Sequence, residues 1–128
     1  MILKPQDIVI ALKLVALRGQ PWSYVQLANE LSMSASEINA GVKRALRARL
    51  LVQLGEGSQP RPNRTALEEF LIHGIKYAFP PDHGAIVRGM ITAYAAPPVA
   101  EQLLINEEFP PVWPYAEGRD RGSSFSPL

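Results

Sequence analysis

The sequence predicts a mainly α-helical protein with one short β-element and a Pro-rich C-terminal extension. Apolar residues recur at helical spacing in four segments, near residues 5–18, 23–31, 34–49 and 65–79. The alternation that is typical of a strand is confined to residues 51–54. We therefore predict an N-terminal domain at 1–79 and a partly irregular extension at 80–128.

The composition indicates a soluble cytoplasmic protein with a substantial core. Hydrophobic residues make up 47% of the 128 residues, which is too many for a disordered chain. The absence of cysteine excludes disulfides and thiolate metal sites and suits the cytoplasm. No run approaches the roughly 18 apolar residues of a membrane span, and residues 1–5 lack the layout of a signal peptide.

The two halves of the chain carry opposite charge. Residues 1–64 hold nine Lys and Arg against four Asp and Glu, which makes +5, whereas residues 65–128 hold four against eight, which makes −4. Within the first half, seven consecutive residues contain Lys43, Arg44, Arg47 and Arg49. A basic cluster beside an acidic body is typical of a module that contacts nucleic acid.

Residues 5–18 are predicted to form a helix that is apolar on nearly all sides. Pro5 and Asp7 both suit its first turn. A helix on the surface of a globular protein should be apolar on one side only. We therefore expect this helix to be buried by the second half of the chain or to form a dimer interface. Trp22, which follows it, is expected to anchor the next helix in the core rather than to contact phosphate.

The stretch at 23–52 carries the strongest local signals. Ser23 is a candidate N-cap, and helical spacing then continues to a break at residues 32–34. Ser34 opens the next helix as the first residue of a capping box, in which Glu37 is the partner. Two helices joined by a turn of about three residues form a helix-turn-helix, whose second helix lies in the DNA major groove.

Residue sizes and helical phase agree with this interpretation. Ala28 is small where the second helix should cross the first, and Met33 is the apolar residue of the turn. The outward face of the second helix is polar and basic. Its centre is predicted to hold Ser36, Asn39, Ala40 and Lys43, with Arg44 and Arg47 flanking it.

The run LANELSMSASEINAGVKRALRARLLV resembles the core of winged helix-turn-helix bacterial transcriptional regulators, whose pattern is roughly LA-x-x-L-x-x-S-x-x-x-[IV], a basic helix and a closing apolar pair. The resemblance is close over residues 23–52 and looser over 1–64, and it implies a winged helix-turn-helix that binds DNA. One departure is Arg49-Leu50, which stands where such proteins usually place glycine. The run HGIKYAFPPDHGAIVRGMITAYAAPPV more weakly resembles the body of small uncharacterised bacterial regulators, and this resemblance does not assign a ligand.

A wing is predicted after the second helix, from the strand at 51–54 and the turn residues that follow it. The wing should be stunted or extended, with Arg61 and Arg64 at its tip, because Pro60 and Pro62 in its second strand cannot donate to a ladder. Arg61 and Arg64 on this stiffened loop are candidates for contacts with phosphate or the minor groove. The alternative is a solvated loop.

The second half of the chain is less clearly patterned. Thr65 with Glu68 is a second capping box that predicts the helix at 65–79, in which Gly74 suggests a close approach of another helix. Residues 85–94 are compatible with a strand or a helix, and a short helix is expected at 99–104. From residue 106 onward, aromatic residues flanked by proline predict an extended segment laid over the body or over another chain. The end of the sequence, Ser-Pro-Leu without a helix or a cap, suggests a truncated or naturally clipped protein.

No catalytic site, metal site or cofactor is predicted. His73 and His83 are the only histidines, and with Asp82 they make an incomplete metal set. No glycine-rich phosphate loop follows a strand, and no Ser, His and Asp share an organising context. We therefore do not expect an enzyme.

The leading hypothesis is a sequence-specific DNA-binding transcriptional regulator, a repressor or autoregulator that acts as a homodimer on paired half-sites. Asn pairs naturally with adenine and Arg with guanine. The expected DNA contacts are Ser34, Ser36, Asn39, Lys43, Arg44, Arg47, Arg61 and Arg64. The alternative hypothesis is a winged-helix module that docks a partner protein through residues 106–128.

Overall fold

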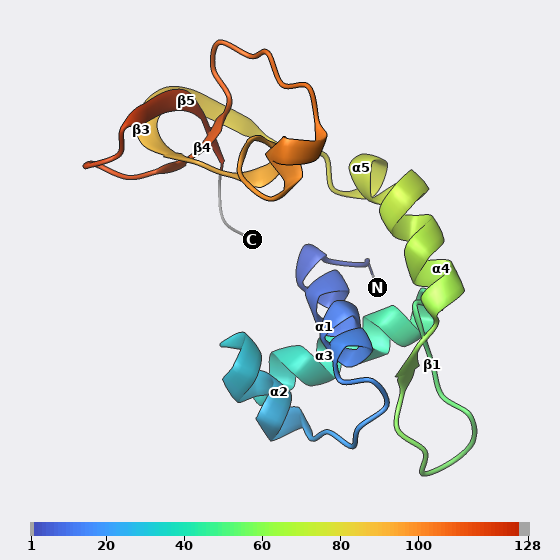
Figure 1. Ribbon diagram of the computed structural model, residues 1–128. Helices are drawn as coiled ribbons and strands as arrows, with labels where there is room; N and C mark the ends of the chain where they lie inside the picture. The colour runs from blue at the N-terminus through green and yellow to red at the C-terminus, as the bar shows by residue number, and fades with distance from the viewer. Residues whose placement is uncertain (1, 126–128) are drawn as a thin grey trace. The chain divides into compact units, whose positions relative to one another are not determined.

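In the computed structural model, which describes residues 2–125, the chain divides into two compact units, Met1–Phe79 and Pro80–Leu128 (Figure 1). The described chain is 44% helix and 19% strand, with one sheet of two strands and one of three. The predicted mainly α fold class with an irregular extension is therefore wrong, and the fold is mixed α and β. Residues 126–128 of the predicted extension lie outside the described residues.

Three helices open the first unit and match the predicted segments at 5–18, 23–31 and 34–49 to within two residues. They are α1 (Pro5–Ala16), α2 (Tyr24–Leu31) and α3 (Ala35–Arg47). The predicted caps are confirmed, because the hydroxyls of Ser23 and Ser34 each accept a hydrogen bond from an amide three residues later. In the turn between α2 and α3, Ser32 is left-handed with φ 56° and Met33 packs against the core.

The helices α1 and α3 cross in close contact at Gly41. A Cβ at this position would lie 2.5 Å from Ile10 Cδ1 and 2.9 Å from Asp7 Oδ1. Glycine therefore allows the crossing, although it costs about 1 kcal/mol of helix propensity relative to alanine. The buried core of the unit comprises Ile8, Ile10, Ala11, Leu14, Trp22, Leu27, Ala28, Ile38, Val42, Ala45, Leu50, Leu51 and Leu67.

A short antiparallel hairpin, the wing, follows α3 and consists of β1 (Leu51–Val52) and β2 (Arg61–Pro62) with their connecting loop. The predicted stunting of its second strand is confirmed, because Pro62 lies opposite Leu51 and has no N–H to donate. Asn63 closes the base of the wing. Its backbone N–H donates to Leu50 O at 2.9 Å and its Nδ2 donates to Arg49 O at 3.1 Å.

The helix predicted at 65–79 is divided into three parts. These are α4 (Arg64–Glu69), a π-helical turn η1 (Phe70–Gly74) and α5 (Ile75–Ala78). The predicted capping box at Thr65 is wrong, because Asn63 Oδ1 accepts from Ala66 N at 3.2 Å and caps the helix two residues earlier. The predicted reason for Gly74 is also wrong. A Cβ there would lie 2.9 Å from the ring of Phe70, so the glycine makes room for a side chain of its own helix.

The second unit is a closed barrel of three strands, β3 (His83–Ile91), β4 (Pro111–Pro114) and β5 (Asp120–Phe125) (Figure 1). β3 pairs antiparallel with both other strands, and β4 pairs in parallel with β5. The ambiguous segment at 85–94 is thus mainly strand. The short helix expected at 99–104 is the 3-10 turn η3 (Val99–Gln102), which follows a second one, η2 (Ala93–Ala95).

Proline does not prevent the segment after residue 106 from forming strands. An extended segment laid over the body or over another chain was predicted there from aromatic residues flanked by proline. Proline lacks an amide donor, but its carbonyl still accepts. Pro110 O accepts from Ser123 N at 3.1 Å, and Pro111 O accepts from Thr92 N at 3.0 Å. The Pro-rich segment therefore joins the barrel through these carbonyl acceptors and through the amide of Tyr115, which donates to Arg88 O at 3.2 Å.

Candidate nucleic-acid interface

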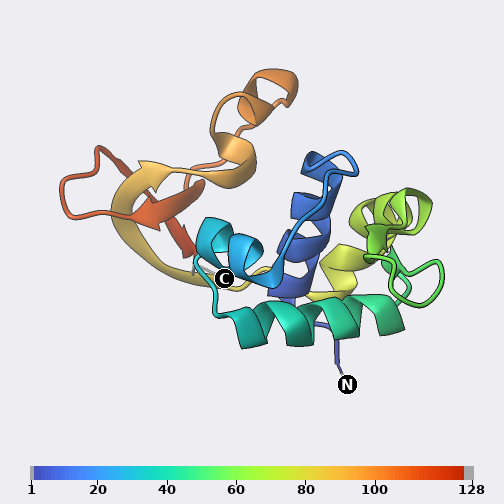
Figure 2. The ribbon, with the colours of Figure 1, turned by 90° about the horizontal axis from the view of Figure 1, so that it is seen from below.

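The outward face of α3 carries polar and basic side chains that are free of the core. Ile38, Val42 and Ala45 are buried on its inner side. In Figure 2, α3 lies along one edge of the first unit, and α1 and α2 lie on the inner side of α3. Ser36, Asn39, Lys43 and Arg47 are exposed. Three of the four residues predicted at the centre of the outward face therefore lie at the surface, where they can meet a ligand, and the fourth, Ala40, is half-buried.

The N-terminus of α3 is held by a reciprocal capping box. Ser34 Oγ accepts from Glu37 N at 3.2 Å, and Glu37 Oε2 accepts from Ser34 N at 2.7 Å. The hydrogen bond that the Ser34 amide donates to the Glu37 carboxylate, and after it the Ser34 side chain, hold the pKa of Glu37 below its ordinary value of 4.5. The Ser34 and Ser36 hydroxyls are hydrogen-bonded at 3.1 Å, and either of them can be the donor. Ser34 therefore orders the start of the helix, while Ser36 extends beyond the cap.

Arg44 does not belong to the outward face. Its Nε donates to Asp7 Oδ2 at 2.7 Å and its Nη2 donates to Asp7 Oδ1 at 2.8 Å, so the pair is bidentate. Asp7 is 0% exposed and the Arg44 side chain is only 13% exposed. The hydrogen bonds to Asp7 raise the pKa of Arg44 above its ordinary value. The prediction of Arg44 as a flanking DNA contact is corrected: this side chain joins α3 to α1.

The C-terminus of α3 turns through a left-handed arginine. Arg49 has φ 64°, the conformation for which glycine is usual. Leu50 N donates to Ala45 O and Arg49 N donates to Leu46 O, both at 3.0 Å, so the helix ends in a Schellman motif. Arg49 therefore makes the turn into the wing that the resemblance associates with glycine, and it leaves its exposed cation beside the end of α3.

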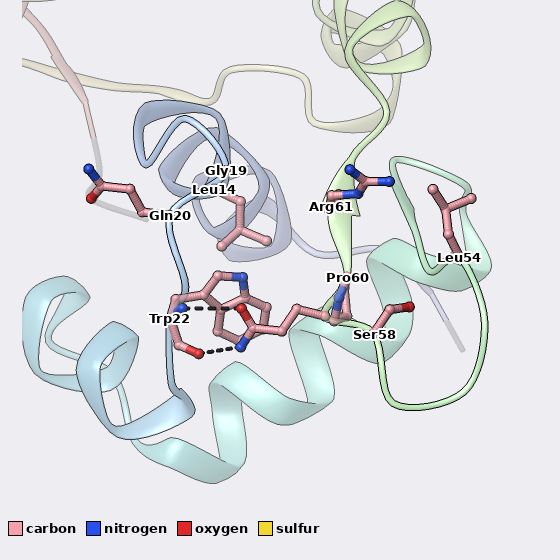
Figure 3. A pocket seen from close by; sticks show the side chains of 9 residues that line it. Leu14, Gly19, Gln20, Trp22, Leu54, Ser58, Pro60 and Arg61 are labelled. Carbon is pink, nitrogen blue, oxygen red and sulfur yellow. Dashed lines mark hydrogen bonds between the residues drawn. The ribbon is translucent and has the colours of Figure 1, made fainter.

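The wing is tied to the loop between α1 and α2 through Gln59. Trp22 N donates to Gln59 Oε1 at 3.2 Å, and Gln59 Nε2 donates to Trp22 O. Beside this contact is a pocket of about 290 Å³, with Trp22 on one side and Arg61 and Leu54 on the other (Figure 3). The Trp22 side chain is buried, which confirms its predicted role as an anchor in the core. These two hydrogen bonds fix the end of the wing loop at Gln59, two residues before Arg61.

The two predicted wing residues lie on different parts of the unit. Arg61 is exposed on β2 and lines the pocket beside Trp22. Arg64 is exposed on α4 and lines a groove with Leu12 and Val15 of α1. The predicted position of both residues at the tip of the wing is therefore wrong: Arg61 lies in the second strand of the wing, and Arg64 belongs to the surface between α1 and α4.

The basic side chains at this surface are free to bind an anion. Across the described residues 2–125, the ion pairs within 4.0 Å are Arg44 with Asp7 and Lys13 with Glu30. The second pair, at 2.8 Å, joins α1 to α2, and Lys13 lowers the pKa of Glu30. On α3, at its C-terminus and on the wing, the cations without a carboxylate partner in the described structure are Lys43, Arg47, Arg49 and Arg61, and Arg64 on α4 has none either. Their field is therefore not compensated locally.

Sequence reasoning missed the contacts that position α3. Asp7 is an acid in a helix that is otherwise apolar, and Gly41 interrupts the basic helix; each departure is a signal that the two helices meet. Gln59 and Asn63 gave no comparable signal, because their partners are backbone groups of residues distant in sequence.

The histidines do not form a metal site in the described structure. His73 is exposed on η1, and the His83 ring packs edge-on against Phe125 with ring centres 4.9 Å apart. Among residues 2–125 there is no cluster of three His, Cys, Asp or Glu that could hold a metal ion. In the same part of the chain, no helix combines the length and the apolar character needed to cross a membrane.

Comparison with known proteins gives no match, whether the chain is compared with protein-family models, with curated proteins or with solved structures.

Proposed function

We propose that the first unit binds double-stranded DNA in a sequence-specific manner, with α3 in the major groove. The observation that carries the proposal is the outward face of α3, where Asn39, Lys43 and Arg47 are exposed and the two cations have no carboxylate partner in the described chain. Backbone capping at Ser34 and the ion pair of Arg44 hold this face in position. The protein would act as a cytoplasmic transcriptional repressor or autoregulator, as a homodimer.

The side chains on α3 suit different roles on a duplex. Asn39 lies nearest the centre of the face and can pair with adenine through two hydrogen bonds, which discriminates by about 1–3 kcal/mol at one base pair. Arg47, one helical turn beyond Lys43, suits a phosphate, which supports binding to every sequence. Arg61 on the wing would reach the backbone or the minor groove beside it.

The experiment is fluorescence anisotropy with a duplex from the upstream region of the protein's own gene and with a scrambled duplex, over a series of salt concentrations. Asn39→Ala should reduce the preference for the cognate duplex about fivefold or more and barely change binding to the scrambled one. Arg47→Ala should weaken binding to both and reduce the salt slope by about one.

Lys76→Ala is the matched control for net charge. Lys76 is exposed on α5, outside α3 and the wing, so its removal changes the total charge without touching the proposed surface. It should leave both affinities within about twofold of the wild type, because salt screens the field of a charge that does not contact the duplex. If the double change Lys43→Ala/Arg47→Ala leaves both affinities unchanged, α3 does not bind DNA.

A second candidate function is the docking of a protein, supported by exposed apolar side chains on the second unit. Met90 and Trp113 are opposite one another on β3 and β4, and both are about half exposed, as is Tyr115. Aromatic residues at a surface are typical of protein interfaces. Binding through these residues should be nearly independent of salt, and Trp113→Ala should abolish it without affecting DNA affinity.

A further inference from the structure

An apolar groove of about 310 Å³ lies between α1 and the segment formed by α4 and η1. It is lined by Leu12, Val15, Arg64, Leu67, Glu68, Leu71 and Ile72. Leu67 is buried, whereas Leu12 and Ile72 remain 41% and 57% exposed. The sequence predicted that α1 is apolar on nearly all sides. Leu12 lies on a side of α1 that does not face the core of the unit. Contiguous apolar surface of this kind is typical of an interaction site.

The charges in the groove indicate what covers it. Arg64 and Glu68 are one helical turn apart on α4. Within a helix, a basic residue that precedes an acidic one at this spacing forms a weaker pair than the reverse order. In the described chain neither has an ion-pair partner within 4.0 Å. A second copy related by a two-fold axis can place its α4 antiparallel, so that each Arg64 faces the partner's Glu68. A partner of uniform charge would instead meet a like charge at one of the two positions.

We propose that this groove is the interface of a symmetric homodimer, in which the exposed Leu12 and Ile72 of each copy pack into the groove of the other. A two-fold interface must be complementary to itself, and this surface has both the apolar content and the paired charges that it needs. The role of the dimer rests on the proposed function, because two copies present two α3 helices to paired half-sites. The interface itself is tested without DNA.

The decisive experiment uses two single variants of the full chain, Arg64→Glu and Glu68→Arg, in sedimentation velocity. The wild type should be dimeric at tens of micromolar. Each variant alone would place like charges opposite one another, so its dissociation constant should rise at least about tenfold. An equimolar mixture of the two should dimerise again, because every altered position then faces an opposite charge on the other variant. Contacts within one chain cannot produce this recovery.

Ile72→Asp tests the apolar part of the interface, with Leu54→Asp as its matched control. Leu54 is 65% exposed on the wing and does not line the groove. Ile72→Asp should yield a monomer, whereas Leu54→Asp should remain a dimer; circular dichroism establishes that both are folded. If Ile72→Asp fails to fold, the mixture of charge variants still decides.

Three results would overturn the proposal. The first is a monomeric wild type, which is expected if another part of the same chain covers the groove. The second is a mixture of the two charge variants that is no more associated than either variant alone. The third is an equal effect of Ile72→Asp and Leu54→Asp on the dimer. A monomer that still binds the cognate duplex would reject the interface and leave DNA binding in place. A dimer through this groove that binds no duplex would support the interface and reject DNA binding.

Discussion

The two units of the chain are stabilised in different ways. In the first unit, thirteen buried apolar residues from three helices, the wing, α4 and the connections between these elements form one cluster. In the described part of the second unit, Val112 is the one large apolar side chain in the buried core. The other buried residues there are Pro111, Gly89 and Gly122. A Cβ at either glycine would overlap the backbone of the neighbouring strand. The barrel is therefore closed by backbone pairing at a diameter that leaves almost no space for side chains.

The difference shows what each unit can contribute to binding. A unit with a packed core holds surface side chains in defined positions, which discrimination between base pairs requires. A barrel with a small core leaves its large apolar residues outside, as Met90, Trp113 and Tyr115 show. Each unit also contains one tryptophan, Trp22 or Trp113. Their fluorescence can follow the two units separately when the other tryptophan is replaced by phenylalanine.

The largest effect on the first unit is expected from Arg44→Ala. Removing the guanidinium leaves the carboxylate of Asp7, which is 0% exposed, without its charged partner. Breaking a buried ion pair in this way costs about 3 kcal/mol or more. Urea unfolding followed by Trp22 in the Trp113→Phe background should show this loss. Arg47→Ala, on the exposed face of the same helix, should change stability by less than about 0.5 kcal/mol.

The contrast between the cores is sharpened by two equal substitutions, Val112→Ala and Val42→Ala. Both side chains are buried, at 0% and 1% exposure, and each change should cost about 2 kcal/mol in its own unit. Because Val112 is most of the side-chain core of the barrel, Val112→Ala should melt the second unit at ambient temperature while the Trp22 transition stays unchanged. Val42→Ala should lower the Trp22 transition without unfolding the first unit. Equal behaviour of the two units would contradict this account.

A smaller effect is expected where α1 crosses α3. Gly41→Ala should destabilise the first unit by about 1.5 kcal/mol, because the clash with Ile10 Cδ1 outweighs the gain in helix propensity. Ile10→Val removes the clashing carbon. It should cost about 1 kcal/mol in the wild type but little or nothing in the Gly41→Ala background. Additive effects in a double-mutant cycle would show that the two positions do not meet.

The smallest effect concerns the cap of α3. Ser34→Ala should cost about 1 kcal/mol, because Glu37 N loses its acceptor. The lowered pKa of Glu37 adds a pH dependence. A lowered folded-state pKa stabilises the protein above pH 4.5, and this contribution is lost as the pH falls through the folded value. The stability difference between wild type and Glu37→Gln should therefore be constant near neutrality and fade below pH 4.5.

Much of the first unit could be predicted from short-range pattern. The spacing of apolar residues and the serine caps place α1, α2 and α3, and the exposed face of α3 follows from the same helical phase. The second unit was not predicted. β4 is short, contains two prolines and has no alternation to read, and it forms a strand because its backbone finds hydrogen-bond partners elsewhere in the barrel.

By itself, the sequence determined the features that depend on neighbours a few residues apart: the helix starts at Ser23 and Ser34, the turn between α2 and α3, and the cluster of basic residues on α3. Only the tertiary structure decided that Arg44 belongs to Asp7 rather than to the outward face. The two residues are 37 positions apart, and helical phase alone cannot show which helix a flanking side chain will meet. A buried carboxylate requires a charged partner, and the crossing of α1 over Gly41 brings Arg44 within reach of it.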